Sequence, residues 1–202
     1  MRYGMVIDLK RCVGCYGCQT SCKAEHGTPP GVLFARVLKR ELGTFPNTRM
    51  VFLPVLCSHC DDAPCVDVCP TGASHYREAG IVDIDKDTCV GCRACMQACP
   101  YAARYYNDEQ RGYYGGQGLT PYEEARYAEQ NCDVVMKCNF CIDRVNEGLE
   151  PACVVNCAAR ARTFGDLEDP TSVVSRLIRQ RGGQQLQPEA GTNPSVYYLP
   201  PE

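Results

Sequence analysis

Cysteines are the residues of this chain whose type and spacing most clearly predict chemistry. Of its 17 cysteines, sixteen fall into four groups of four. In the third group, Cys89, Cys92, Cys95 and Cys99 are followed by Pro100, which gives the spacing C-x2-C-x2-C-x3-C-P. This spacing is typical of cubane iron–sulfur clusters, in which three thiolates on a tight loop hold one cluster and the fourth reaches a neighbouring cluster. The pattern therefore predicts [4Fe–4S] clusters that occur in pairs.

The other three groups keep most of this pattern. The first group has the same spacing, the second has two extra residues between its second and third cysteines, and in the fourth eleven residues separate Cys141 from Cys153. The left-over cysteine, Cys132, is expected to be a buried bystander rather than a fifth ligand. The three groups are Cys12, Cys15, Cys18 and Cys22; Cys57, Cys60, Cys65 and Cys69; and Cys138, Cys141, Cys153 and Cys157.

Disulfides and zinc are the competing explanations for so many cysteines. A disulfide framework is expected in small secreted chains, but no secretory signal precedes the first group. Zinc sites use two separated pairs of ligands. They do not need a third cysteine that follows a pair after two further residues, as Cys18 follows Cys15. The fourth group alone also fits zinc, and its partnership with the first group favours iron. We therefore expect all sixteen cysteines to be iron ligands, in a chain that does not fold without its clusters.

Charge and composition exclude several classes of function. The formal net charge of −3 argues against a nucleic-acid partner. No apolar run approaches the roughly 18 residues that a spanning helix needs, so direct membrane insertion is not expected. The sequence shows no Ser/His/Asp triad, pair of acids or phosphate-binding loop. The chain is therefore not predicted to be an enzyme by itself, and substrate turnover is expected to belong to a partner.

Several polar residues stand close to the cysteines. Lys23, Arg93 and Lys137 either raise the reduction potentials of nearby clusters or are solvated surface charges, and the sequence does not choose between the two. The histidines are expected to lie near a cluster sulfur or at the surface rather than to bind iron, because four thiolates are already available for each cluster. The three histidines are His26, His59 and His75.

The elements that position the cysteines repeat within the chain. Residues 2–11 predict a short strand that leads into the first group, and the dipeptide Ile-Asp precedes both Cys12 and Cys89, which stand 77 residues apart. Residues 79–85 likewise predict a hairpin strand ahead of the third group. This repeat of loop, helix, turn and strand predicts an α+β fold of tandem bacterial-ferredoxin-like modules.

Two inserts interrupt the modules. In the first, Val32–Leu42 and Met50–Leu56 are predicted strands joined by a turn. The second, between Cys99 and Cys138, is rich in tyrosine, and Thr120 is the predicted cap of a short helix. Tyrosines suit interfaces and packed interiors, and contact with a partner is slightly favoured for this insert.

The chain ends in a C-terminal extension, residues 167–202. Asp169 to Arg181 predict an amphipathic helix that ends at Gly182, and residues 187–202 are expected to lie extended over a surface. We expect this extension to dock a partner.

Cross-ligation requires the four groups to work in pairs. Adjacent pairing and nested pairing both satisfy the count of cysteines, but the short link from Cys69 to Cys89 favours joining the second group to the third. The expected organisation of this single iron–sulfur protein, residues 1–202, is then two lobes that each hold two [4Fe–4S] clusters. The inner module is residues 55–105, and the outer module is residues 1–30 with 135–166.

The whole chain resembles the four-cluster iron–sulfur subunit of the dimethyl sulfoxide reductase family of molybdenum or tungsten enzymes. The resemblance is carried by the four groups in order and by Met5-Val-Ile-Asp-Leu-Lys-Arg-Cys-Val-Gly-Cys15, Cys57-Ser-His-Cys-Asp-Asp-Ala-Pro-Cys65 and Lys137-Cys-Asn-Phe-Cys141. Gly43-Thr-Phe-Pro46 and Pro188-Glu-Ala-Gly-Thr192 are most similar to the small subunit of respiratory arsenate reductase. Polysulfide and thiosulfate reductases belong to the same family.

The resemblance implies nested pairing and four [4Fe–4S] clusters, because no cysteine of the third group is replaced. Each cluster would take three thiolates from one group and its fourth from the partner group. The implied ligand sets are Cys12, Cys15, Cys18 and Cys157 for cluster 1; Cys138, Cys141, Cys153 and Cys22 for cluster 2; Cys57, Cys60, Cys65 and Cys99 for cluster 3; and Cys89, Cys92, Cys95 and Cys69 for cluster 4.

The resemblance also implies partners and a role. A large catalytic subunit would hold a bis-pterin molybdenum or tungsten cofactor, and a membrane subunit that handles quinone, or a soluble cytochrome, would stand at the other end. The chain would pass electrons between them. Family members are often exported with a twin-arginine-tagged partner, so we expect a periplasmic location, with the cytoplasm as the alternative. The rival functions are a freestanding polyferredoxin, which the two inserts argue against, and a zinc-binding scaffold.

Overall fold

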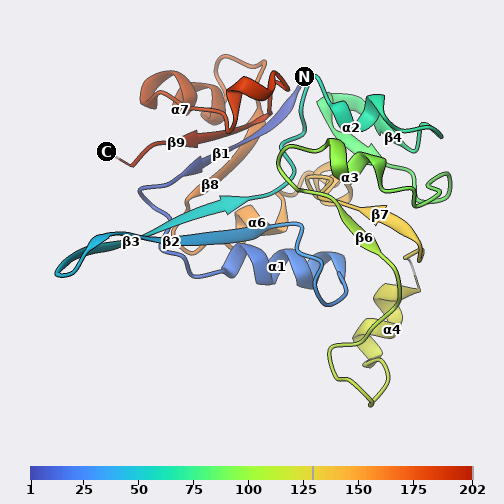
Figure 1. Ribbon diagram of the computed structural model, residues 1–202. Coiled ribbons are helices and arrows are strands. Elements are labelled where there is room, and N and C mark those ends of the chain that lie inside the picture. Colours follow the sequence, from blue (N-terminus) through green and yellow to red (C-terminus); the bar gives the residue numbers. More distant parts are fainter. Residues whose placement is uncertain (129, 202) are drawn as a thin grey trace.

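The computed structural model of the protein describes residues 1–128 and 130–201. Its secondary structure consists of short helices and four small sheets within these residues (Figure 1). The strands are β1 (Tyr3–Asp8), β2 (Arg36–Thr44), β3 (Asn47–Val55), β4 (Ser74–Tyr76), β5 (Val82–Ile84), β6 (Tyr105–Asn107), β7 (Val134–Met136), β8 (Arg162–Asp166) and β9 (Val196–Leu199). The helices are α1 (Gly17–His26), α2 (Pro64–Asp67), α3 (Ala94–Ala98), α4 (Pro121–Tyr127), α5 (Ile142–Asn146), α6 (Ala152–Val155) and α7 (Val173–Arg181), with 3-10 turns at Glu78–Gly80 and Pro188–Ala190.

The three-stranded sheet has the order β8-β1-β9 and joins the two ends of the chain. β1 runs antiparallel to β8, with Met5 opposite Phe164, and parallel to β9, with Met5 opposite Val196. Residues 196–199 are extended as predicted, but they are buried rather than laid over a surface, because Val196 and Leu199 are apolar and the backbone of β9 completes the hydrogen bonding of β1. The expectation is wrong for residues 188–190, which form an exposed 3-10 turn.

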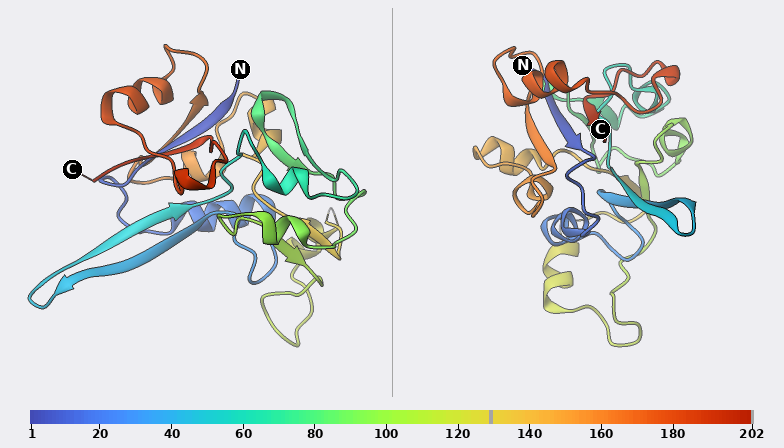
Figure 2. Two further views of the ribbon diagram at one scale, coloured as in Figure 1. Left: turned by 45° about the horizontal axis from the view of Figure 1, so that its top comes forward. Right: turned by 90° about the vertical axis from the view of Figure 1, so that its left-hand side faces the viewer.

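The first insert forms a two-stranded arm, β2 and β3, that projects from the body of the molecule (Figure 2). The arm turns at Phe45, whose side chain is 92% exposed. The predicted hairpin is confirmed, but its first strand begins at Arg36 rather than at Val32. Residues before Arg36 stay in a loop because the Lys23 ammonium donates to the carbonyls of Thr28 and Val32, at 3.1 and 2.9 Å.

The helices that carry cysteines pack in two pairs. α1, which bears Cys18 and Cys22, lies against α6, which bears Cys153, and α2, which bears Cys65, lies against α3, which bears Cys95. The structure thus brings the first group beside the fourth and the second beside the third. The predicted internal repeat is visible in the backbone as well, because the residue before α1 and the residue before α3 share left-handed φ values of 59° and 63°. These residues are Tyr16 and Arg93.

The predicted helix starts are confirmed with one shift. Thr120 caps α4 in a capping box with Glu123, in which the hydroxyl accepts from the Glu123 amide and the carboxylate accepts from the Thr120 amide. α7 begins at Val173, after Ser172 as its cap, rather than at Asp169, and ends at Gly182 as expected. No helix in the described part of the chain is long and apolar enough to cross a membrane.

Candidate iron–sulfur centres

Three thiols of the first group and the last cysteine of the fourth group line one cavity. Cys12, Cys15, Cys18 and Cys157 line this cavity, and most of its remaining wall is apolar, from residues such as Val37 and Pro54 at the root of the arm. Three of these thiols come from the tight loop before α1 and its first turn, and the fourth comes from the segment after α6. An apolar chamber with four thiols suits a cubane cluster, whose ligands must come from a loop and from one more distant cysteine.

A second set of thiols, called the enclosed set, is buried. It consists of Cys22, Cys138, Cys141 and Cys153. Burial raises the pKa of the Cys22 thiol above its usual range, and the neighbouring thiols of Cys153 and Cys141 raise it further. The pKa of Cys138 is raised in the same way, with Cys22 and Cys141 among its neighbours. Such thiols lose their protons readily only where a metal compensates the charge, and their mutual proximity therefore fits a shared metal centre.

The third set joins the second and third groups. Burial raises the pKa of Cys60 to about 12, and its neighbouring thiols are Cys57, Cys65 and Cys99, although a hydrogen bond with Thr192 opposes the shift. The last cysteine of the third group thus lies near three cysteines of the second. This third set also lies near the enclosed set, because the thiol of Cys57 is among the groups that raise the pKa of Cys138.

The remaining cysteines lie around α3. Cys89, Cys92 and Cys95 come from the loop before α3 and its first turn, while Cys69 follows α2, which packs on α3. The amide of Ser74 donates to the Cys69 thiol at 3.3 Å, and amide and hydroxyl hydrogen bonds outweigh burial, so the pKa of Cys69 is lowered. A thiolate held by amide donors is prepared to act as a ligand.

No three His, Cys, Asp or Glu side chains among residues 1–128 and 130–201 converge tightly enough to bind a single metal ion. A cubane cluster is larger than one ion and spaces its thiolates more widely. The separated but neighbouring thiols of the four sets therefore fit clusters by their donor type and their grouping.

Two equivalent loops of the internal repeat each bring one cysteine to the surface. Cys15 and Cys92 are the exposed members of the four groups, and the valines beside them, Val13 and Val90, are 64% and 65% exposed. The thiols of the enclosed set and of Cys57, Cys60 and Cys65 are buried.

Buried cations adjoin the thiols, and the sequence indicated only one of them. Lys137 is buried, so its interpretation as a solvated surface charge is wrong; its ammonium donates to the carbonyls of Cys138, at 2.6 Å, and Val82. The guanidinium groups of Arg104 and Arg162 are also buried, and both contact cysteine sulfurs. The sequence analysis did not identify these arginines. Each is the second residue of an Ala-Arg pair and stands five residues after the last cysteine of its group, Cys99 or Cys157.

The other two cations near the ligands have structural roles. The Arg93 guanidinium stacks over the ring of Tyr106 at 3.6 Å from its centroid. Lys23 is half-buried and holds the loop before β2, and burial lowers its pKa to about 8. Arg93 is exposed, which fits its interpretation as a solvated surface charge, whereas half-buried Lys23 does not fit that interpretation.

The three histidines occupy different environments. The Nε2 atom of His26 lies 3.2 Å from the Cys141 sulfur, as expected for a polar residue beside a ligand. His59 is completely buried, stacks on Phe140 at 3.8 Å, and accepts a hydrogen bond at Nδ1 from the Val82 amide. His75 hydrogen-bonds the Ala73 carbonyl through Nδ1, at 2.9 Å.

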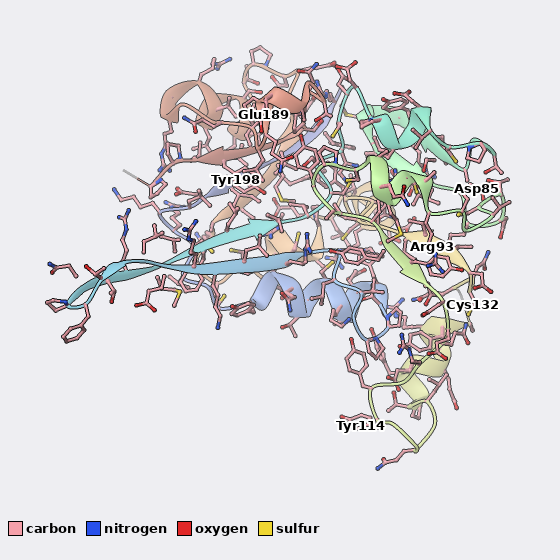
Figure 3. The ribbon with its side chains drawn as sticks, in the orientation of Figure 1. Asp85, Arg93, Tyr114, Cys132, Glu189 and Tyr198 are labelled. Atoms are coloured by element: carbon pink, nitrogen blue, oxygen red, sulfur yellow. The ribbon has the colours of Figure 1, made fainter. Side chains whose placement is uncertain are left out.

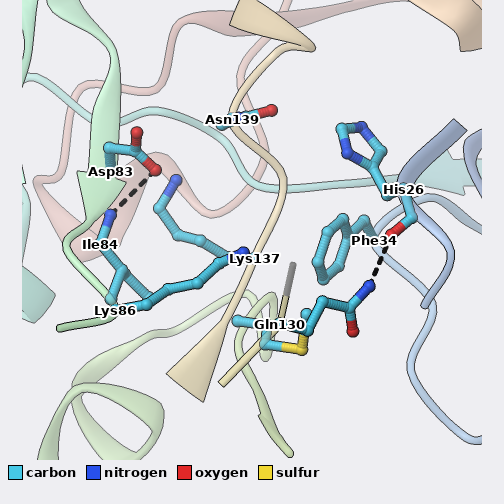
Figure 4. Close-up of a pocket in the computed structure, with 9 residues that line it drawn as sticks. His26, Phe34, Asp83, Ile84, Lys86, Gln130, Lys137 and Asn139 are labelled. Atoms are coloured by element: carbon cyan, nitrogen blue, oxygen red, sulfur yellow. Dashed lines mark hydrogen bonds between the residues drawn. The ribbon is translucent and has the colours of Figure 1, made fainter. Parts of the chain in front are cut away.

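Two features lie outside the four sets. Cys132 is exposed, so the expectation of a buried bystander is wrong; it lies at the periphery of the molecule, in the turn before β7 (Figure 3). A pocket between His26, Phe34, Ile84 and Lys137 contains no cysteine among its lining residues (Figure 4). Its wall is formed by side chains that also support the thiols, and it is not one of the four sets.

Comparison with known proteins agrees with this geometry. Residues 48–115 and 111–167 each match the family described as 4Fe-4S dicluster domain. The chain is 41% identical to the arsenate respiratory reductase iron–sulfur subunit ArrB of Shewanella sp. strain ANA-3, over 98% of this chain and 96% of that protein. It is 43% identical to a subunit of the sulfite dehydrogenase of Allochromatium vinosum, over 97% and 82%, and 42% identical to a subunit of the tetrathionate reductase of Salmonella typhimurium, over 98% and 72%.

Ferredoxin-like dicluster domains, built from small sheets and short helices, are thus the class to which this fold and these thiols belong. Within that class, the chain belongs to the family of iron–sulfur subunits of molybdopterin oxidoreductases. It carries four [4Fe–4S] clusters and transfers electrons for a molybdenum-containing catalytic subunit, without being catalytic itself.

Proposed function

We propose that electrons pass through the four clusters in a fixed order, from cluster 1 through clusters 2 and 3 to cluster 4. The order is supported by the exposure of Cys15 in the set proposed for cluster 1 and of Cys92 in the set proposed for cluster 4, whereas no cysteine of the two sets proposed for clusters 2 and 3 is exposed. The proximity of Cys57 to Cys138 supports the middle step. Short distances matter because electrons tunnel only between neighbouring centres, and this chain of neighbours is the single observation that carries the proposal.

The proposed ligand sets follow the nested pairing. Cluster 1 takes three cysteines from the first group and one from the fourth, and the cavity that these four thiols line supports it. The packing of α1 on α6 and of α2 on α3 supports two tandem modules, an outer one and an inner one of two clusters each. The proposed ligands are Cys12, Cys15, Cys18 and Cys157; Cys22, Cys138, Cys141 and Cys153; Cys57, Cys60, Cys65 and Cys99; and Cys69, Cys89, Cys92 and Cys95.

The proposed partners stand at the two exposed ends. One is the catalytic subunit, with a bis-pterin molybdenum or tungsten cofactor, and the other is a membrane subunit that handles quinone, or a soluble cytochrome. The proposed substrate of the complex is an oxyanion of arsenic or sulfur, since the similar proteins are named for arsenate, sulfite and tetrathionate. The proposed location is the periplasm, where the chain would arrive folded with an exported partner.

Interrupting the middle of the array tests this function. In the purified complex, Cys138→Ser removes a thiol from a buried set, so we expect turnover driven by quinol or cytochrome to fall at least tenfold. A dye that reduces the catalytic subunit directly should still support turnover. Cys132→Ser, which changes the exposed cysteine outside the four sets, is the matched control. Unchanged quinol- or cytochrome-driven turnover in Cys138→Ser would show that electrons do not pass through the buried set.

The substrate is tested separately. The complex, reduced by a viologen dye, is assayed with arsenate, tetrathionate and sulfite in turn, and with arsenite in the oxidative direction. Turnover of an arsenic or sulfur oxyanion supports the proposal, and a complex that reduces only dimethyl sulfoxide contradicts it. A chain that elutes alone near 22 kDa with intact clusters would instead be a freestanding electron shuttle.

A further inference from the structure

Two buried arginines occupy equivalent places in the internal repeat. Arg104 follows Cys99 by five residues, and Arg162 follows Cys157 by five residues. Both side chains are buried, at 4% exposure. Each thus stands just beyond the cysteine that its group contributes to the partner group, which places it where two sets of thiols meet.

Arg162 lies between the first two sets. One guanidinium nitrogen, Nη1, lies 3.6 Å from the Cys153 sulfur. The side chain also lines the cavity that contains the thiols of Cys12, Cys15 and Cys18. Its Nη2 atom is buried and has no hydrogen-bond partner among the described residues. An unpartnered donor of a buried cation is costly, so its position at the wall of this cavity indicates an acceptor inside it.

Arg104 lies between the other two sets. Its Nη2 atom donates to the Cys65 sulfur at 2.9 Å, and its Nη1 atom donates to the Ser74 hydroxyl at 2.7 Å. The Cys95 thiol is a further neighbour, and it is among the groups that raise the pKa of this arginine. Ser74 in turn donates its amide to the Cys69 sulfur. One guanidinium therefore reaches Cys65 of one proposed cluster and Cys95 of the next.

Neither arginine has a carboxylate partner in the parts of the chain that the structure describes. The ion pairs there involve other arginines or the N-terminal amine. The groups that raise the pKa of Arg162 are led by the thiols of Cys153 and Cys18. A buried, unpaired cation is strongly unfavourable unless an anion compensates it. Iron–sulfur clusters with four thiolates are anions, and they become more negative on reduction.

We propose that Arg104 and Arg162 are positioning residues that set the reduction potentials of the clusters in pairs, Arg162 for clusters 1 and 2 and Arg104 for clusters 3 and 4. Each guanidinium is a fixed positive charge between two clusters, so it stabilises the reduced form of both and raises both potentials together. The arginine keeps its proton while one electron passes, and no bond is made or broken. Because both potentials move together, the driving force for the step between the two clusters of a pair stays the same, while both clusters become easier to reduce.

The inference rests on the proposed ligand sets and is tested by redox titration. The intact complex is titrated anaerobically and followed by electron paramagnetic resonance, in Arg162→Gln, Arg104→Gln and the double variant. We expect each single variant to lower the potentials of two clusters and leave the other two unchanged. The expected loss is at least tenfold in the equilibrium constant for reduction, which is about 59 mV for a one-electron couple. The double variant should lower all four.

Matched variants separate charge from structure. Arg162→Lys and Arg104→Lys keep the positive charge but lose the planar guanidinium that donates on two sides. Their shifts in reduction potential should therefore be smaller than those of the glutamine variants. Arg160→Gln removes an exposed charge two residues from Arg162 and should shift no potential. Iron content and elution volume of every variant show whether the clusters and the fold persist.

Three outcomes would overturn the inference. The first is four unchanged potentials in a glutamine variant with full iron content. The second is an equal shift of all four potentials in each single variant. The third is loss of clusters in both the lysine and the glutamine variants of one arginine, because that residue would then serve assembly. A wild-type complex without four clusters would instead contradict the proposed function itself, so the two failures are distinguishable.

Discussion

Ile7 of β1 pairs in parallel register with Tyr198 of β9, so the strand that leads into the first cysteine group depends on the C-terminal residues. Leu199, next to Tyr198, is completely buried against Val6 and Val174. The C-terminal strand therefore stabilises the loop that presents Cys12.

Leu199→Ala should destabilise the protein. Removing a fully buried leucine side chain costs about 2–5 kcal/mol, from lost burial and from the cavity left behind. The measurement is the denaturant concentration at which visible cluster absorbance is lost under anaerobic conditions. Leu149→Ala, at a leucine that is 48% exposed, is the control and should change little. Equal shifts in the two variants would mean that β9 does not support the cluster loop.

Nested pairing predicts which cysteines share a cluster. Cys22→Ser and Cys138→Ser should each reduce the iron content by up to about four atoms per chain, and the double variant should lose no more than one of them alone. Cys22→Ser combined with Cys12→Ser should lose up to about eight, although these cysteines belong to one sequence group. Iron analysis with spectroscopy of the reduced protein measures the losses. If Cys22 shares its loss with Cys12 instead, the ligand sets are wrong.

The cluster chemistry could be predicted from sequence because it depends on local spacing. The tight loop from Cys89 to Cys95 needs no tertiary information to be recognised. The pairing of β1 with β9 could not be predicted, because a parallel contact between strands more than 180 residues apart leaves no local pattern and Val196–Leu199 is too short to indicate a neighbour. The start of the first strand of the arm was misplaced for a similar reason, since Val32 is held by a lysine nine residues before it.

The two arginines were missed because composition places arginine at the surface, and nothing next to Arg104 or Arg162 in the sequence indicates burial. The repeat contained the signal. The residue pairs Ala103-Arg104 and Ala161-Arg162 stand at equal distances from Cys99 and Cys157, and an alignment of the chain with itself would have shown it. Cys132 was predicted to be buried because cysteine usually is, but it is exposed.

Gly14 and Gly91 are equivalent glycines of the two cluster loops, and their substitutions should differ. Both have positive φ, of 67° and 64°, so alanine costs about 1–2 kcal/mol at either position. A Cβ atom at Gly14 would meet the ring of Phe52, whereas one at Gly91 would meet the carbonyl oxygen of Asp133. The ring of Phe52 can be removed by a substitution, whereas the backbone carbonyl of Asp133 cannot.

Gly91→Ala should therefore lose more cluster iron than Gly14→Ala. Adding Phe52→Ala should restore part of the loss in Gly14→Ala, leaving the cost of the backbone conformation, and should not help Gly91→Ala. Iron per chain after anaerobic purification is the measurement, with Phe52→Ala alone as the control. No rescue of Gly14→Ala would mean that the contact with Phe52 does not limit this loop.

Glu123 should make the tyrosine-rich insert sensitive to acid. Its carboxylate accepts hydrogen bonds from the amides of Thr120 and Tyr113, both at 2.7 Å, and these bonds lower its pKa below the usual 4.5. Because the folded pKa is depressed, the carboxylate stabilises α4 above pH 4.5, and this contribution is lost as the pH falls from 4.5 through the folded pKa.

Hydrogen exchange of residues 110–127, corrected for the intrinsic rate, should therefore show lower protection below pH 4.5. Glu123→Gln keeps an acceptor for the cap but cannot titrate, so its protection should not follow this profile, and any loss it shares with the wild type comes from the rest of the protein. Identical profiles in the two proteins would mean that the carboxylate of Glu123 does not control the stability of the insert.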